Sequence, residues 1–314
     1  MISRSISSWL AVGVCLLLPL GAETQPPSNA AVFLRLPAST RALALGDVYS
    51  AHGGDEAAIF YNPGQLAGPD KRSAGISVQR HIQSTSLATL AARFPLGDGV
   101  VGVGIHALDY GTVDEIAADP ASDLGSPTGQ SISATDFAAA VGYAVSRGRV
   151  RAGGSLKLIR QQIVGASGGT GAFDAGFAIA IWSDAALAIS VNNIGGSVTL
   201  SGVSAPIPRT ARLGLASPSE KLGPVRARAV AELEHERGRQ TEIAGGAEAV
   251  WTASNSITLL GRIGASARHE SAAASMAFGG GLVIRNFALD YAYQDFSALG
   301  ATHRVGVRLW AKRA

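Results

Sequence analysis

Apolar and polar side chains alternate along most of the chain from Ser73 onward. Successive side chains of a β-strand point to opposite faces, so each alternating segment has one apolar and one polar face. In 225–236, for example, Ala229 and Leu233 alternate with Arg228 and Glu232. The pattern predicts about fourteen strands, at 73–81, 85–94, 99–108, 134–145, 149–160, 171–181, 185–194, 209–217, 225–236, 239–251, 256–266, 275–284, 286–294 and 303–311.

The lengths of these segments suit strands that cross a bilayer, since a tilted membrane strand needs roughly 9–11 residues. Only helices and closed barrels satisfy every backbone group in lipid, and no stretch after the first 22 residues has the apolar length of a spanning helix. We therefore predict an all-β fold, a transmembrane antiparallel β-barrel of about fourteen strands. The charged faces would line its lumen, with Arg151, Lys157, Arg226, Arg228, Glu232, Glu234, Glu242, Glu248 and Arg308.

A soluble β-sandwich would show the same alternation with its apolar faces turned inward. Three features favour the barrel. The apolar faces are rich in Ala, Gly and Val, which pack a soluble core poorly. Both signs of charge occur on neighbouring strands, as in a polar lumen. The series of strands also runs unbroken to the C-terminus.

The connections between the strands fall into two groups. Several are tight, such as Arg147-Gly148 and Arg237-Gly238, and suit hairpin turns. Others, at 109–133, 161–170 and 195–208, are longer. Outer-membrane barrels have short turns on the periplasmic side and longer loops outside, so we expect 109–133 to be an extracellular loop.

The first 22 residues predict a cleaved signal peptide. Arg4 supplies the positive start, residues 9–20 form a short apolar core, and Leu20-Gly21-Ala22 is an acceptable cleavage site. The only cysteine, Cys15, lies within this segment. We therefore expect an exported mature chain that has neither disulfides nor thiolate chemistry.

Composition and motifs give no sign of catalysis or of nucleic-acid binding. The formal net charge is only +3 and there is no run of Lys and Arg. Gly165-x-Ser167-x-Gly169 matches a nucleophile motif, but the required strand, turn and helix context is missing from the sequence. The six histidines are not spaced like metal ligands. We expect no enzyme activity, no cofactor and no metal site.

Residues 31–68 carry the most specific motif of the chain. Arg41, Gly46 and an acidic position at Asp55 lead to Tyr61-Asn62-Pro63. This series resembles the N-terminal plug of the PorV/PorQ family, which are outer-membrane barrels related to the FadL fatty-acid channels. The family usually has Ala where Gly64 stands here. The resemblance implies a signal peptide at 1–22, a periplasmic leader and plug at 23–72, and an outer-membrane barrel at 73–314.

Three functions follow as alternatives. A PorV/PorQ-type protein would sit in the outer-membrane lipid and bind or shuttle exported proteins in a type IX-like secretion pathway, through loops such as 109–133 and 195–208. A FadL-like channel would instead take up a hydrophobic small molecule. A soluble exported β-sandwich is the third alternative. The resemblance favours the first, with secreted cargo or secretion machinery as partners.

Overall fold

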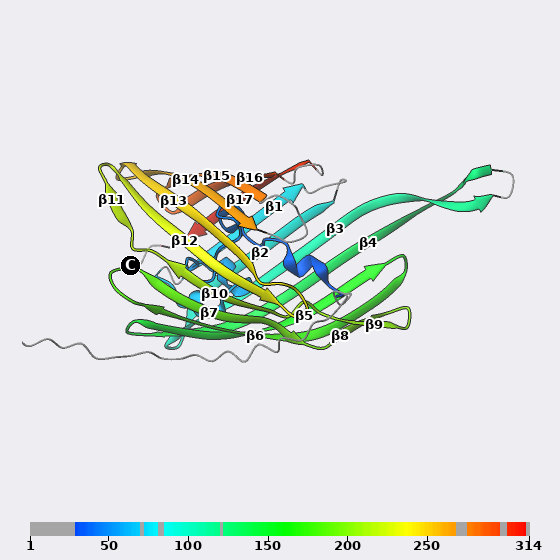
Figure 1. Cartoon of the computed structure of the whole chain (residues 1–314), viewed down its shortest axis with the longest axis horizontal. Helices are drawn as coiled ribbons and strands as arrows, with labels where there is room; N and C mark the ends of the chain where they lie inside the picture. The colour runs from blue at the N-terminus through cyan, green and yellow to red at the C-terminus, as the bar shows by residue number, and fades with distance from the viewer. Residues whose placement is uncertain are drawn as a thin grey trace, which may run out of the picture.

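The computed structural model describes residues 29–69, 72–80, 85–119, 122–267, 275–295 and 300–311. The predicted signal peptide and the last three residues lie outside these ranges. Fourteen antiparallel strands form a closed barrel (Figure 1). They are β1 (Ser73–Arg80), β2 (Ser86–Leu96), β3 (Gly99–Asp119), β4 (Ser122–Arg147), β5 (Val150–Ile163), β6 (Ala166–Ala180), β7 (Ala186–Gly195), β10 (Thr210–Ala216), β12 (Val225–Glu236), β13 (Glu242–Ser254), β14 (Ile257–Ala267), β15 (Ser275–Ile284), β16 (Phe287–Asp295) and β17 (Ala301–Trp310).

Strand neighbours follow chain order around the barrel. The ring closes where β1 pairs with β17, and Ser73 lies opposite Trp310 in that register. On the other side, β10 pairs with both β7 and β12. A short strand, β11 (Glu220–Leu222), pairs with the end of β12. The predicted fold class, with about fourteen strands, is confirmed.

The barrel is apolar outside and polar inside. On β5, Leu156 and Leu158 are 62% and 63% exposed, whereas Ser155 and Lys157 between and beside them are buried. A sandwich would bury the leucines and expose the lysine. The third alternative, a soluble sandwich with an apolar interior, is therefore wrong for this fold.

The longest predicted loop is largely strand. Strands β3 and β4 continue past the barrel as a hairpin that projects from one end (Figure 1), and their pairing reaches Asp119 and Ser122. Val113 and Ile132, both good strand formers, pair within this extension. The expectation of a loop at 109–133 was wrong because strand formers such as Val113 and Ile132 stand between its turn-forming residues and extend the β3–β4 pairing.

A second expected loop also contains strands. Within 195–208, β8 (Ser197–Leu200) pairs with β9 (Val203–Pro206) as a separate two-stranded sheet. We call the end of the barrel that carries the β3–β4 projection the hairpin end. The opposite end has short turns, such as the one between Arg147 and Val150.

The N-terminal segment lies inside the barrel (Figure 1). It contains four short helical turns: η1 (Val32–Arg35), α1 (Thr40–Leu43), η2 (Glu56–Phe60) and η3 (Pro63–Ala67). Among the described residues, no helix has the length and apolar character needed to cross a membrane. We call residues 29–36 the strap and residues 37–69 the plug body.

Candidate functional site: the plugged lumen

The plug body owes its shape to capping side chains from the sequence motif. Asn62 is fully buried and caps η3, since its Oδ1 accepts from the Gly64 N–H at 3.0 Å, with Pro63 at the first helical position. The Asn62 amide also donates to the carbonyls of Ser50 (3.0 Å) and Phe177 (3.1 Å). Phe177 belongs to β6, so one side chain caps a turn and attaches it to the wall. A buried amide with these partners leaves no donor unsatisfied.

Tyr61 and Gly46 hold the other end of the plug body. The Tyr61 hydroxyl donates to Asp47 Oδ1 at 2.7 Å and accepts from the Ala38 N–H at 2.8 Å. Gly46 has φ +74°, a left-handed conformation that glycine adopts without strain, and it lies directly against the backbone of Ala265 on β14. The bend at Gly46 therefore brings the plug backbone onto the barrel wall.

Glycines of the barrel wall make room for the plug body. At each of them an added Cβ would lie less than 3.0 Å from a plug atom. These wall glycines come from nine strands around the ring, so the plug is fitted against the wall on all sides. They are Gly75, Gly102, Gly104, Gly153, Gly176, Gly214, Gly246, Gly264, Gly279 and Gly306.

A buried ionic network joins α1 to three wall strands. Arg41 donates to both carboxylate oxygens of Glu248 on β13, at 3.2 and 2.9 Å. Glu248 also accepts from Arg262 of β14 at 2.7 Å, and Arg262 reaches Asp290 of β16 at 2.5 Å. His52 lies 2.7 Å from Arg41, and burial together with that guanidinium lowers the pKa of His52 to about 4. His52 is thus neutral, and the network alternates acid and base.

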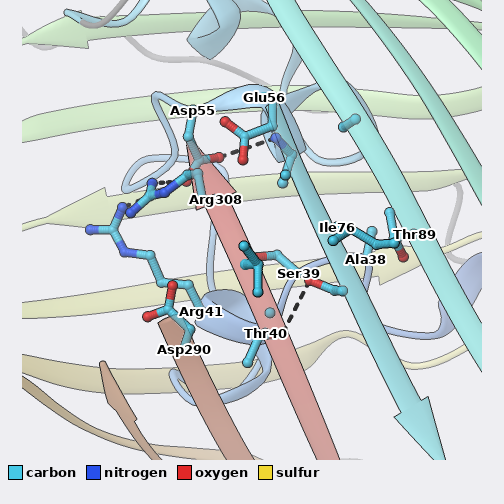
Figure 2. Close-up of a pocket in the computed structure, with 16 residues that line it drawn as sticks. Ala38, Ser39, Thr40, Arg41, Asp55, Glu56, Ile76, Thr89, Asp290 and Arg308 are labelled. Atoms are coloured by element: carbon cyan, nitrogen blue, oxygen red, sulfur yellow. Dashed lines mark hydrogen bonds and ion pairs between the residues drawn. The ribbon is translucent and has the colours of Figure 1, made fainter. Parts of the chain in front are cut away.

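The second half of the network centres on Asp55. Burial opposes its ionisation, but Arg308 of β17, at 2.9 Å, and Arg41, at 3.8 Å, hold the pKa of Asp55 below its ordinary value. The Tyr49 hydroxyl donates to the same carboxylate. Asp55 also caps η2 by accepting from the Ala57 N–H at 3.2 Å. Both halves lie along one cavity (Figure 2).

A third buried cluster holds the loop after Tyr49. Glu232 of β12 accepts from the Ser50 N–H at 2.9 Å and from the Ser50 hydroxyl. Arg212 of β10 bridges Glu232, at 2.9 Å, and Glu234, at 3.0 Å. Its guanidinium also lies 5.5 Å from the centre of the Tyr61 ring. Glu232 thus carries both a wall ion pair and a plug contact.

The remaining residues proposed for the lumen have separate partners. Arg151 donates to Gln65 of the plug at 2.7 Å. Lys157 pairs with Asp174 within the wall at 2.9 Å. Arg228 pairs with Asp184 in the turn after β6. Two others are peripheral: Glu242 lies 3.8 Å from Arg239, and Arg226 is exposed opposite Lys221.

Arg304, which the alternation in 303–309 places on the polar face together with Arg308, is buried and donates to the Pro37 carbonyl of the plug body. Two further arginines that are buried on the inner face, Arg212 and Arg262, were not predicted from the sequence. Each stands at a position on the polar face of a strand with alternating apolar and polar side chains, as Arg262 does in Leu260-Gly261-Arg262-Ile263. The same alternation that identified Arg308 would have identified them.

The strap fills the hairpin end of the lumen with apolar side chains. Phe33 is buried among Leu87, Leu108 and Ile159 of the wall, and Val198 and Ile207 cover the group from the β8–β9 side. The Phe33 ring stacks on His106 with centroids 5.9 Å apart. Three hydrogen bonds anchor the strap to the wall. Asn29 and Arg35 both donate to Glu236, at 2.6 and 2.5 Å. The Ala31 N–H donates to Gln161 at 2.7 Å.

The space left in the lumen is small. Cavities beside the plug hold about 10 to 70 Å³ each. A drug-sized ligand needs roughly 300–1,000 Å³. In the part of the chain that the structure describes, no group of His, Cys, Asp and Glu is arranged to hold a metal. None of these four cavities is large enough for a drug-sized ligand, and many of the charged side chains around the plug form ion pairs.

Solved structures share this architecture. The toluene transporter TodX of P. putida is 14% identical, with a TM-score of 0.59, over 89% of this chain and 99% of that one. The monoaromatic hydrocarbon channel CymD is 9% identical with a TM-score of 0.60, over 87% and 95%. A FadL homologue of Pseudomonas aeruginosa is 11% identical with a TM-score of 0.56, over 87% and 98%.

The fold is thus that of the FadL-type barrels, and the similar solved proteins are transport channels. No protein-family model matches the sequence, and no curated protein is significantly similar to it. The finer resemblance to PorV/PorQ therefore rests on the motif residues alone.

Proposed function

We propose that the protein is an outer-membrane conduit for hydrophobic small molecules, exported by the signal peptide at 1–22. The observation that carries this proposal is the apolar group around Phe33, which occupies the hairpin end of the lumen. A hydrophobic molecule arriving from outside would find its first apolar surroundings there. The fold shared with TodX and CymD supports the same function.

A hydrophobic molecule that enters the lumen at the hairpin end would bind beside the strap or displace it. Burial of an aromatic ring gains about 25 cal/mol for each Å² of apolar surface removed from water, and a ligand ring can make the same contacts that Phe33 makes now. The polar anchors at Glu236 and Gln161 lie at the edge of this apolar group. Movement of the strap would expose the apolar wall without breaking the ion pairs of the plug body.

Toluene binding to the detergent-purified protein tests the proposal. Ile159→Asn places a polar amide in the apolar group and should weaken binding about fivefold or more, since an unpaired buried amide costs about 1–3 kcal/mol. Leu158→Asn is the matched control, because this neighbouring side chain faces outward and is 63% exposed. It should leave toluene affinity within about twofold of wild type by the same argument.

Uptake by cells provides the second measurement. Cells that express the protein should accumulate toluene or a long-chain fatty acid faster than cells without it, and Ile159→Asn should reduce the gain. Equal uptake with and without the protein, together with no measurable binding of either probe, would reject the conduit.

A second candidate is the PorV-type binding of exported proteins. The feature that favours it is the projecting β3–β4 hairpin, on which Val113 and Ile116 are 63% and 62% exposed outside the barrel. Removing residues 112–131 should then abolish cross-linking of exported proteins to the barrel and leave toluene uptake unchanged. Unchanged cross-linking would remove this candidate.

A further inference from the structure

Glu56 is a buried acid with incomplete partners. It is the first residue of η2 and is only 5% exposed. The Ser73 side chain makes a hydrogen bond to the Glu56 carboxyl group, but Oε2 has no hydrogen-bond partner among the described residues. Its Oε1 lies against Gly75 of β1, where any added Cβ would collide with it. The carboxyl group thus fills the contact between plug and wall.

The cations near Glu56 donate their hydrogen bonds to other groups. Figure 2 shows Asp55, Glu56 and Arg308 gathered at one end of a cavity of about 30 Å³. Arg308 donates to Asp55, not to Glu56. The charged and titratable groups of the elements around this site are Tyr49, Asp55 and Arg41 on the plug body, Arg93 on β2, His106 on β3, Asp290 on β16 and Arg308 on β17.

Most of these groups already have partners other than Glu56. Arg93 donates to Ser73 and to the Leu66 carbonyl, at 2.9 and 2.8 Å, and Asp290 is bound by Arg262. Arg41 is held by Glu248. An ionised Glu56 would therefore be a buried charge without a dedicated counter-ion, whereas a neutral Glu56 would fit its site. Buried charges of this kind are costly.

We propose that Glu56 is a proton-binding site that controls how firmly the plug body is attached to the β1 wall. With the proton bound, the carboxyl group lies against Gly75 and the contact is closed. Without it, the carboxylate draws water into the adjacent cavity and the η2 contact loosens. A cavity of about 30 Å³ has room for water, which needs roughly 10–15 Å³ per molecule in this measure. This goes beyond the proposed conduit, because it holds whatever molecule crosses.

The pKa agrees in direction with this geometry. Burial, aided by the charge of Asp55 and opposed by Arg308, raises the pKa of Glu56 to about 7 from an ordinary value of 4.5. When folding raises the pKa of an acid, the acid stabilises the closed contact in full at a pH below its ordinary pKa. That contribution is lost as the pH rises through the raised value. The plug contact should therefore loosen between about pH 5 and pH 7.

Infrared difference spectroscopy of the purified full-length protein in detergent measures the proton directly. The wild type should show the carbonyl band of a protonated carboxylic acid at pH 5.5, to be lost by about pH 8 as the group ionises. Glu56→Gln should lack this band. Glu220→Gln, at an exposed position on β11, is the matched control and should retain it. Absence of a band titrating near neutral pH in the wild type overturns the proposal without any variant.

Hydrogen exchange measures the contact itself. After correction for intrinsic exchange, amides of 55–60 in the wild type should open more readily as the pH rises, by up to about tenfold per pH unit. In Glu56→Gln this pH dependence should disappear, with protection at pH 8 equal to that of the wild type at low pH. The same slope in both proteins would show that Glu56 does not control the contact. Toluene uptake plays no part in either readout, so a failure here is distinct from a failure of the conduit.

Discussion

The plug body and the strap fill neighbouring parts of one lumen by different physical means. The plug body lies with its backbone against the wall glycines and is bound by buried ion pairs such as Arg41–Glu248 and Arg308–Asp55. The strap instead inserts Phe33 into an apolar group and has polar anchors at Glu236 and Gln161. The two regions are continuous in sequence, and both bury apolar side chains, but close backbone contact with wall glycines is found at the plug body.

The difference shows which part of the lumen can exchange its contents. Ion pairs and close backbone contacts demand one geometry, and breaking a buried pair by removing one partner costs about 3–5 kcal/mol. Apolar contacts are non-directional, so another apolar molecule can replace Phe33 with little loss. We therefore expect the plug body to act as the seal and the strap to act as the replaceable occupant.

Deletion gives the largest expected effect. Removing 31–68 should leave a barrel but open the lumen, with a large rise in conductance across planar bilayers. Removing only 29–36 should leave the seal closed, because the wall glycines and ion pairs of the plug body remain. Removal of 112–131 from the projecting hairpin is the control outside the lumen. Equal conductance for the two N-terminal deletions would erase the distinction between plug body and strap.

Removing one charge from the buried ionic network should have the second largest effect. Glu248→Gln leaves Arg41 and Arg262 buried without their shared carboxylate. We expect a loss of about 3–5 kcal/mol in the free energy of unfolding, measured by urea titration in detergent. Exposed Glu220→Gln should change it by less than about 0.5 kcal/mol. A small effect at Glu248 would mean that the network is solvated.

The outward face of the wall provides a contrast to both regions. Ala229 lies on the exposed side of β12, so Ala229→Arg should cost about 2–4 kcal/mol if the side chain meets lipid at mid-membrane depth. Val225→Arg, on the same face at the strand end, should cost only about 0–1 kcal/mol. Refolding into lipid vesicles measures both. Equal costs would contradict the depth assigned to Ala229.

A single methyl group on the wall should have the smallest of these effects. Gly264→Ala would force its Cβ into the plug backbone at Leu45 and Gly46, and overpacking typically costs about 1–3 kcal/mol. Gly261→Ala lies three residues away on the outward face, with nothing near its added Cβ, and should be neutral or slightly stabilising. Protease sensitivity of residues 37–69 shows whether the plug is displaced, and no difference between the variants would remove the role of the wall glycines.

The barrel itself could be predicted because its pattern is local. Alternation within 225–236 assigns Ala229 outward and Glu232 inward before any partner is known, and the structure places both so. The pattern failed beyond the barrel, where the expected loop 109–133 continues as paired strands. There the ladder extends into space without a lumen or a lipid face, so no alternation marks it.

The sequence by itself determined the strand count, the polarity of the two barrel faces and the presence of a separate N-terminal motif. Each of these depends on the period of two along a strand or on a short run of residues. Only the tertiary structure decided which charges meet: Arg41 and Glu248 are 207 positions apart. It also decided that inward glycines on nine strands would receive the plug, and that Glu56 Oε2 would be buried without a hydrogen-bond partner. Those outcomes depend on the register of the strands and on the path of the plug through the lumen. The local alternation of side chains determines neither of them.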